Sequence, residues 1–241
     1  MSGIYEDGLG PVAANFTALS PLSFMRRSQD VYPQRLAVIY GQRRDTWSEC
    51  YRRCVQVADA LTKRGVERGT TVAILAANIP ELFEAHFAIP MAGAVLNAIN
   101  TRLDAATIRF ILEHGEARVF LVDREFGEVA EQALVGLESP PLVIGIDDQQ
   151  YPGGKLIGAL DYQTLVAEGD GAGDCRLPDN EWDAIALNYT SGTTGNPKGV
   201  VYHHRGAYLN AVSNVLTWEM GNHPVYLWTL PMFLCNGWCF P

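Results

Sequence analysis

The most informative stretch of the chain is Ala184-Ile-Ala-Leu-Asn-Tyr-Thr-Ser-Gly-Thr-Thr-Gly-Asn-Pro-Lys-Gly199. Its first six residues form an apolar run typical of a buried strand. The ten residues that follow contain four hydroxyl side chains, three glycines and Lys198. Glycines let a backbone approach a ligand closely, and hydroxyls, exposed amides and a lysine attract anionic oxygens. Because ligands bind beyond the carboxyl ends of strands in open α/β sheets, the pattern predicts an anion-binding loop.

Two other nucleotide-binding patterns do not fit this stretch. A Walker loop has Gly directly before its Lys and Ser or Thr after it, whereas Lys198 lies between Pro197 and Gly199. No Gly-x-Gly-x-x-Gly fingerprint follows an early strand, which removes the usual dinucleotide-binding interpretation. Composition alone leaves a flexible surface loop without a ligand as the alternative.

Outward from this stretch, apolar runs and helical patterns alternate along the chain. We expect strands at residues 36–40, 72–75, 94–99, 119–122, 142–146, 184–189 and 200–202. We expect helices at residues 21–32, 80–86, 104–114, 126–137 and 162–167, and one from a capping box at Thr46 and Glu49 to Gly65. The segment 149–183 is rich in Gly, Asp and Pro and predicts a surface excursion. This alternation predicts an α/β fold with a mainly parallel sheet flanked by helices on both faces.

Composition excludes several classes of protein. Hydrophobic residues make up 48% of the 241 residues and charged residues 19%, as in a globular rather than a disordered chain. The net charge of −9 argues against binding to nucleic acid or to an anionic membrane. The longest mostly apolar stretch, residues 87–99, is shorter than the roughly 20 residues that span a bilayer. We therefore expect a soluble protein.

Cysteines and histidines give no sign of a metal site. The five cysteines are an odd number in a chain without a signal peptide, which predicts reduced thiols and a cytoplasmic location. Cys50 and Cys54 fit a helix face turned toward the core better than a metal pair. His86 and His114 fall within predicted helices and are interpreted as ordinary helix residues. Residues 203–205 fit a solvated turn, and we assign them no catalytic role.

Residues 189–199 resemble, position for position, the phosphate-loop signature of the adenylate-forming superfamily, which includes acyl-CoA synthetases, luciferases and peptide-synthetase adenylation domains. Further stretches resemble the same superfamily at residues 40–49, 72–80, 90–94 and 100–103. Residues 230–238 resemble a later motif of AMP-dependent acyl-CoA synthetases for short and medium acids, such as methylmercaptopropionate-CoA ligase. The resemblance implies that the chain forms part of the large N-terminal domain of the adenylate-forming fold. It also implies that a helix begins near residue 204.

What the resemblance implies is an ATP-dependent carboxylic acid–CoA ligase of fatty acid metabolism. The acid attacks the α-phosphate of Mg-ATP to give an acyl-adenylate and pyrophosphate, and CoA then displaces AMP. ATP, Mg²⁺ and CoA are thus the expected cofactors, and a small carboxylic acid and CoA the expected partners; a homodimer is left open. The residues implied to hold the phosphates are Thr190, Ser191, Gly192, Thr193, Thr194, Gly195 and Lys198. Among them Lys198 and Thr193 are the implied catalytic residues, and Thr190 is the implied metal contact.

The acyl and pantetheine side is implied to involve Leu234 and Trp238. Synthetases usually carry histidine where this chain has Leu234, and leucine can neither donate a hydrogen bond nor carry charge. Whether this branch diverged, the residue was engineered, or the site works less well is left open. Phe233 and Trp238 fit packing better than catalysis, with Trp238 as a wall of the acyl pocket.

The resemblance also sets the expected division of the chain. Residues 1–65 are a lead-in with helices, 66–225 an α/β subdomain ending in the phosphate loop, and 226–241 the start of a further subdomain. The family's adenine and magnesium motif, ribose-binding aspartate, hinge and C-terminal domain with its lysine do not follow. We expect an N-terminal portion that is inactive by itself. The alternatives are an adenylation domain that loads a carrier protein and a truncated, non-catalytic nucleotide-binding or scaffold protein.

Overall fold

The structure is a computed structural model that describes residues 3–190, 197–234 and 236. In these ranges the α-helices are α1 (Leu22–Val31), α2 (Trp47–Lys63), α3 (Pro80–Met91), α4 (Ala105–His114), α5 (Gly127–Leu134), α6 (Tyr162–Glu168) and α7 (His204–Thr217). The strands are β1 (Leu36–Tyr40), β2 (Arg43–Thr46), β3 (Thr71–Leu75), β4 (Val95–Ala98), β5 (Val119–Asp123), β6 (Leu142–Ile146), β7 (Leu160–Asp161), β8 (Ala184–Thr190) and β9 (Lys198–His203). A short 3-10 helix, η1, spans Arg124–Phe126.

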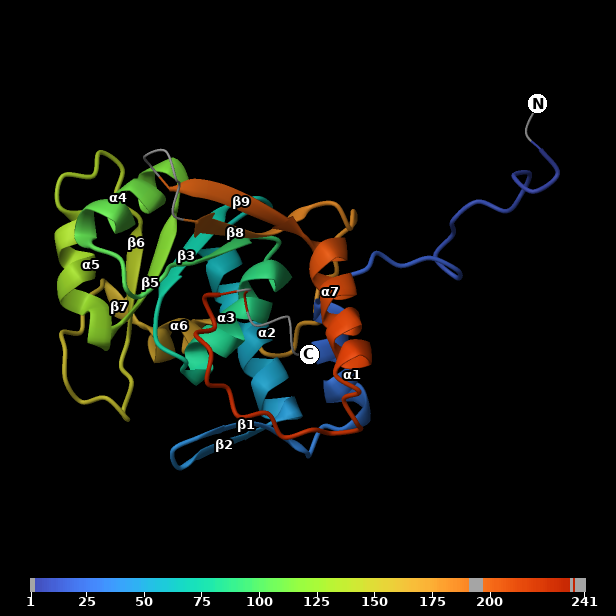
Figure 1. Ribbon diagram of the computed structural model, residues 1–241, viewed down its shortest axis with the longest axis horizontal. Coiled ribbons are helices and arrows are strands. Elements are labelled where there is room, and N and C mark those ends of the chain that lie inside the picture. The colour runs from blue at the N-terminus through green and yellow to red at the C-terminus, as the bar shows by residue number, and fades with distance from the viewer. Residues whose placement is uncertain (1–2, 191–196, 235, 237–241) are drawn as a thin grey trace.

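A seven-stranded sheet forms the centre of the molecule (Figure 1). Its strand order is β7-β6-β5-β3-β4-β8-β9, and every neighbouring pair is parallel except β8 and β9. The hairpin of β1 and β2 lies apart from it as a two-stranded antiparallel sheet. The predicted α/β class with a mainly parallel sheet is confirmed.

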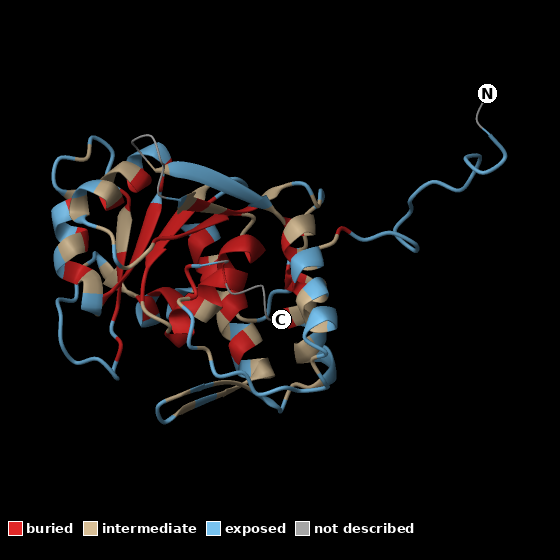
Figure 2. Cartoon of the chain, viewed as in Figure 1, coloured by how far each residue is buried: buried red, intermediate tan, exposed pale blue. Residues whose placement is uncertain are grey.

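Each face of the sheet buries its own apolar cluster because side chains alternate along a strand. In β3, Val72 and Ile74 belong to the cluster that includes α1, α2, α3 and α6, whereas Ala73 and Leu75 belong to the cluster with α4 and α5. Figure 2 shows the inner strands buried and β9 exposed at the edge. Strands covered on both sides carry continuous apolar runs, which is why the sequence displayed them so clearly.

The start of α2 agrees with the predicted capping box. The Thr46 hydroxyl accepts a hydrogen bond from the Glu49 amide, and the Glu49 carboxylate accepts one from the Thr46 amide at 2.8 Å. Helical spacing then turns Cys50 and Cys54 inward, where both side chains are fully buried as free thiols. The predicted core-facing role of these two cysteines is confirmed.

Several boundaries differ from those predicted. The sequence Arg-Arg-Asp-Thr of β2 has no apolar alternation, and it is a strand only because it pairs with β1. The two-residue β7 exists likewise through its pairing with β6. Helix α5 is shorter than predicted at both ends, and β9 begins at Lys198 rather than at Val200. For the three strands, a pairing partner outweighs local sequence preference.

Helix α3 continues five residues beyond the predicted end at His86, to Met91. Pro90 lacks the amide that would bond to the carbonyl of His86, and this would ordinarily favour an earlier end. It lies within the last turn, however, and all but one of the twelve residues of α3 are buried. Burial of the helix on every side therefore outweighs the loss of one hydrogen bond.

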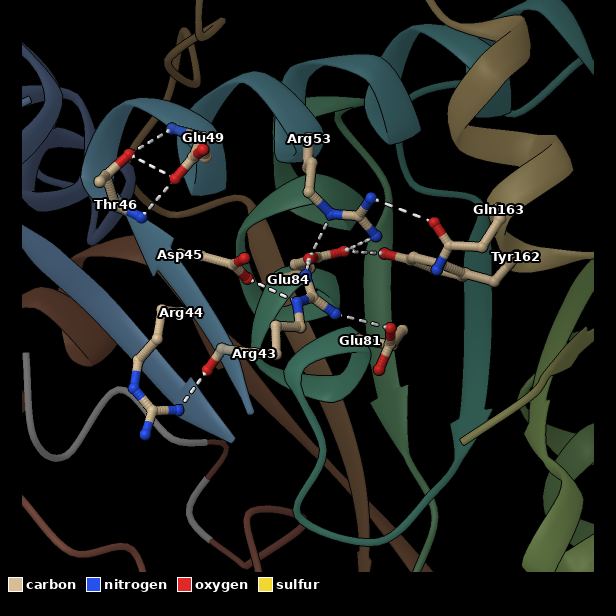
Figure 3. A network of polar contacts seen from close by, with 10 residues as sticks. All are labelled: Arg43, Arg44, Asp45, Thr46, Glu49, Arg53, Glu81, Glu84, Tyr162 and Gln163. Carbon is tan, nitrogen blue, oxygen red and sulfur yellow. Dashed lines mark hydrogen bonds and ion pairs between the residues drawn. The ribbon is translucent and has the colours of Figure 1, made fainter. Parts of the chain in front are cut away.

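A charged network joins the β1–β2 hairpin to three helices (Figure 3). Glu84 of α3 has a side chain only 1% exposed and accepts hydrogen bonds from Arg43 at 2.6 Å, Arg53 at 2.7 Å and the Tyr162 hydroxyl at 2.9 Å. Arg43 also pairs with Asp45 and Glu81. Burial lowers the pKa of Arg53, but the hydrogen bond and charge of Glu84 outweigh it and raise that pKa above its usual value.

We predict that Glu84→Gln lowers the free energy of unfolding by about 3 kcal/mol, because it leaves two partly buried guanidinium groups without their shared carboxylate. Urea unfolding of the chain measures the loss. Glu113→Gln, an exposed change on α4, is the matched control and should stay within about 0.5 kcal/mol of the unmodified chain. Equal stability of the two variants would contradict the prediction.

The structure buries two histidines, His86 and His204, and places a third, His203, at the start of α7. His203 caps α7 by accepting a hydrogen bond from the Gly206 amide at 2.8 Å, so the solvated turn expected from composition was wrong and the helix start implied by the resemblance is confirmed. His204 is 4% exposed, and its Nδ1 lies 2.8 Å from the buried Ser20 hydroxyl oxygen. Burial lowers the pKa of His86 and of His204 to about 4.

This shift makes stability depend on pH. Since the ordinary pKa of histidine is 6.5 and that of folded His204 about 4, the unfolded chain binds more protons between these values, and stability falls as pH decreases. We predict that lowering the pH from 7 to 5 reduces the free energy of unfolding of the unmodified chain by about 2 kcal/mol more than that of His204→Asn. Urea unfolding at both pH values measures the difference, and identical losses would refute it.

Candidate phosphate-binding site

The two ends of the predicted phosphate loop lie side by side at the end of the β8–β9 hairpin. Thr190, the last residue of β8, pairs with Lys198, the first residue of β9, and Tyr189 pairs with Gly199. Directly paired residues project from the same face, so Thr190 and Lys198 share one face and both are exposed. The predicted site residues Ser191, Gly192, Thr193, Thr194 and Gly195 lie outside the described residues.

The hairpin end is weakly tied to the rest of the sheet by main-chain pairing. β8 and β4 share a single registered pair, Leu96 with Ala186, and β9 is the last strand of the sheet. One residue beyond that pair, the Asn97 side-chain amide donates a hydrogen bond to the Leu187 carbonyl at 2.7 Å. A side chain of β4 thus continues the attachment of β8 where the ladder stops.

Tyr189 and Gly199 pack closely on the face toward α4. A Cβ atom on Gly199 would lie 3.0 Å from Leu187 Cδ1 and 3.6 Å from Tyr189 Cζ. The missing side chain at position 199 therefore leaves room for Leu187 and for the tyrosine ring over the start of β9. On the far side of the ring, the Tyr189 hydroxyl lies 2.7 Å from Nδ1 of His114, the last residue of α4. Sequence reasoning treated His114 as an ordinary helix residue and missed this contact.

The segment that carries Leu234 lies beyond the carboxyl end of β3. Asn78, three residues after β3, donates to the Leu230 carbonyl at 2.7 Å and accepts from the Met232 amide at 2.8 Å. The parallel strands β3, β4 and β8 have their carboxyl ends on the same side of the sheet, so this segment and the end of β8 lie on that side. Phe233 is buried, as its predicted packing role requires, whereas Leu234 is 54% exposed. Trp238 lies outside the described residues.

Hard cations favour oxygen ligands, and the donors at the hairpin end fit this preference. Mg²⁺ is usually held by one or two protein oxygens together with the phosphates of a substrate. The exposed Thr190 hydroxyl could supply such an oxygen beside a nucleotide. Among the described residues no group of three or more His, Cys, Asp or Glu side chains could hold a metal by itself. A metal bound here would therefore depend on the phosphates of the nucleotide for most of the negative charge around it.

No helix in the described part of the chain is long and apolar enough to cross a membrane.

The fold and the hairpin together define an α/β domain with a phosphate-loop sequence at the carboxyl end of an inner parallel strand. The AMP-binding enzyme family matches residues 25–241. The chain is 49% identical over 98% of its length to an acetate/butyrate–CoA ligase of Arabidopsis thaliana, named as peroxisomal, and 48% identical over its whole length to an acetate–CoA ligase of Humulus lupulus. An anthranilate CoA ligase, AuaEII, solved with anthranoyl-AMP, has the same fold: its TM-score is 0.76 at 23% identity over 95% of this chain and 45% of AuaEII.

The chain belongs to the AMP-binding enzyme family, as the resemblance of residues 189–199 predicted. It spans 43% of the Arabidopsis relative and 44% of the Humulus relative. The parallel sheet flanked by helices is thus the fold found in the N-terminal region of adenylate-forming CoA ligases.

We predict that Asn97→Ala loosens the hairpin end locally. Loss of the bond to Leu187 should lower the free energy of unfolding by about 1 kcal/mol. It should also speed amide hydrogen exchange at residues 187–190 and 198–201, while exchange in β3 stays unchanged because β3 is paired on both sides. Mass spectrometry of exchanged peptides makes the comparison, with the exposed change Gln132→Ala on α5 as control. Uniform acceleration across the sheet would count against a local role.

Proposed function

We propose that the protein containing this chain is an ATP-dependent carboxylic acid–CoA ligase that proceeds through an acyl-adenylate. The observation that carries this proposal is the hairpin that places Lys198 opposite Thr190, at the two ends of a hydroxyl- and glycine-rich segment. Membership of the AMP-binding enzyme family and the names of the relatives, which are CoA ligases, support it. Those names also favour CoA over a carrier-protein thiol as the acceptor.

In this proposal the hairpin end binds the β- and γ-phosphates of ATP. The Lys198 ammonium neutralises negative charge that grows on pyrophosphate as it leaves, and the turn supplies hydroxyl and amide donors. Thr190 would hold Mg²⁺ jointly with the phosphates, and the ion would supply further neutralisation of their charge. The catalytic roles proposed for Thr193 and Lys198 consist of positioning and charge stabilisation, since no group of the protein forms a bond to phosphorus.

Short- or medium-chain acids are the proposed substrates, since the relatives reported above are named for acetate and butyrate. The segment beyond β3, with Leu234 and Trp238, is proposed to lie on the acyl side, because it lies on the same side of the sheet as the end of β8. The described free thiols at Cys50, Cys54 and Cys175 fit a reducing compartment. We propose that the protein is located in the cytoplasm, whereas the Arabidopsis relative is named as peroxisomal. A role in fatty acid metabolism and a homodimer likewise stay predictions.

Lys198→Ala in the full-length protein should slow adenylation by up to about 100-fold, because it removes one charged donor to the transition state. Acid-dependent ATP–pyrophosphate exchange measures adenylation, and transfer from a preformed acyl-adenylate to CoA measures the second half-reaction. The second half-reaction should change much less. Lys155→Ala, which removes an exposed lysine paired with Glu131, is the matched control. Equal slowing of both half-reactions would refute the role assigned to Lys198.

A further inference from the structure

The last residues of β8 depend on side chains for their position. Beyond the single pair with β4, main-chain pairing among the described residues joins them only to β9, which is exposed and is the last strand of the sheet in that part of the chain. Two described side chains from the body of the domain form hydrogen bonds with this end: Asn97 donates to the carbonyl of Leu187, and His114 pairs with the hydroxyl of Tyr189. Of the two, the contact at Tyr189 lies nearer to the phosphate-binding turn.

His114 is itself held in place. Its ring stacks on that of Phe110, one turn earlier on α4, with ring centroids 5.2 Å apart and an interplanar angle of 25°. The Tyr189 ring meets both rings edge-on, at interplanar angles of 83° to Phe110 and 81° to His114. Burial raises the pKa of Tyr189, so its hydroxyl keeps its proton and can take part in a neutral hydrogen bond. These contacts fix the tyrosine ring relative to α4.

The position of the ring matters for the phosphate-binding residues on either side of the hairpin. Tyr189 directly precedes Thr190, and its cross-strand partner Gly199 directly follows Lys198. Because the ring packs over Gly199 on one face, it contacts both strands next to the pair that bears Thr190 and Lys198 on the opposite face. Tyr189 therefore links the helix end to the residues proposed to hold ATP.

We propose that His114 is a positioning residue for ATP binding, acting through its hydrogen bond to Tyr189. This inference rests on the proposed function. His114 touches no phosphate itself; it holds the tyrosine, and the tyrosine holds the Thr190–Lys198 pair at the spacing that suits a polyphosphate. The contact should affect ATP and leave the carboxylic acid and CoA unaffected, since neither binds at the α4 end of the hairpin in this proposal.

The test uses ATP–pyrophosphate exchange in the full-length protein with four variants. His114→Phe keeps the ring stack and removes the hydrogen bond, Tyr189→Phe removes the hydroxyl from the other side, and a double variant combines them. His114→Asn places a polar atom near the position of Nδ1 and serves as the conservative replacement. Glu113→Gln, an exposed change beside His114, is the control. Thermal unfolding of each variant confirms that it is folded.

We expect His114→Phe and Tyr189→Phe each to raise the KM for ATP by about threefold to tenfold, with the KM for the acid unchanged. The double variant should equal the single ones, because both remove the same bond. His114→Asn should restore most of the lost affinity. An unchanged KM for ATP, an equal rise for ATP and the acid, or additive effects would each overturn the inference while leaving the proposed function intact. Absence of any acid-dependent exchange in the unmodified protein would overturn both.

Discussion

The proposed site depends on one pairing at the end of the β8–β9 hairpin, that of Thr190 with Lys198. The chain leaves β8 at Thr190 and returns antiparallel beside it at Lys198, which brings the two ends of the hydroxyl- and glycine-rich segment together. A turn of hydroxyl residues and glycines at the carboxyl end of a strand presents donors rather than apolar side chains. The proposed site would therefore attract anions in a chain whose net charge of −9 opposes their binding.

The remainder of the domain provides a rigid base for that turn. The parallel strands are buried between two apolar clusters, and the carboxylate of Glu84 draws the β1–β2 hairpin onto helices α2, α3 and α6. In the described part of the chain, β9 is the last strand of this sheet and pairs on one side only, with β8. Side chains such as Asn97 compensate where the ladder ends. A binding site at a sheet edge can then combine a fixed position with access for a large ligand.

Much of this could be predicted from the sequence. Doubly covered strands such as β3 and β5 carry continuous apolar runs, and α2 begins at a capping box that can be identified residue by residue. The phosphate-loop sequence identified the family because its eleven residues are specific in kind and order. These features depend on neighbours in sequence or on burial, both of which leave a local pattern.

The features that were missed depend on partners distant in sequence. β2 has no strand pattern and forms only against β1, and Asn97 is a single polar residue in an apolar run whose partner lies 90 residues away. His114 is 75 residues from Tyr189 and has the spacing of any helix residue. A polar residue inside a buried strand is the one signal that could have drawn attention to Asn97. No local signal distinguishes His114.

The most direct test of the central claim is a crystal structure of the full-length protein with a non-hydrolysable ATP analogue. We predict oxygens of the β- or γ-phosphate at hydrogen-bond distance, about 3 Å, from Lys198 Nζ and from donors of the segment that follows Thr190. A triphosphate bound elsewhere, with Lys198 and the turn directed away from it, would contradict the account.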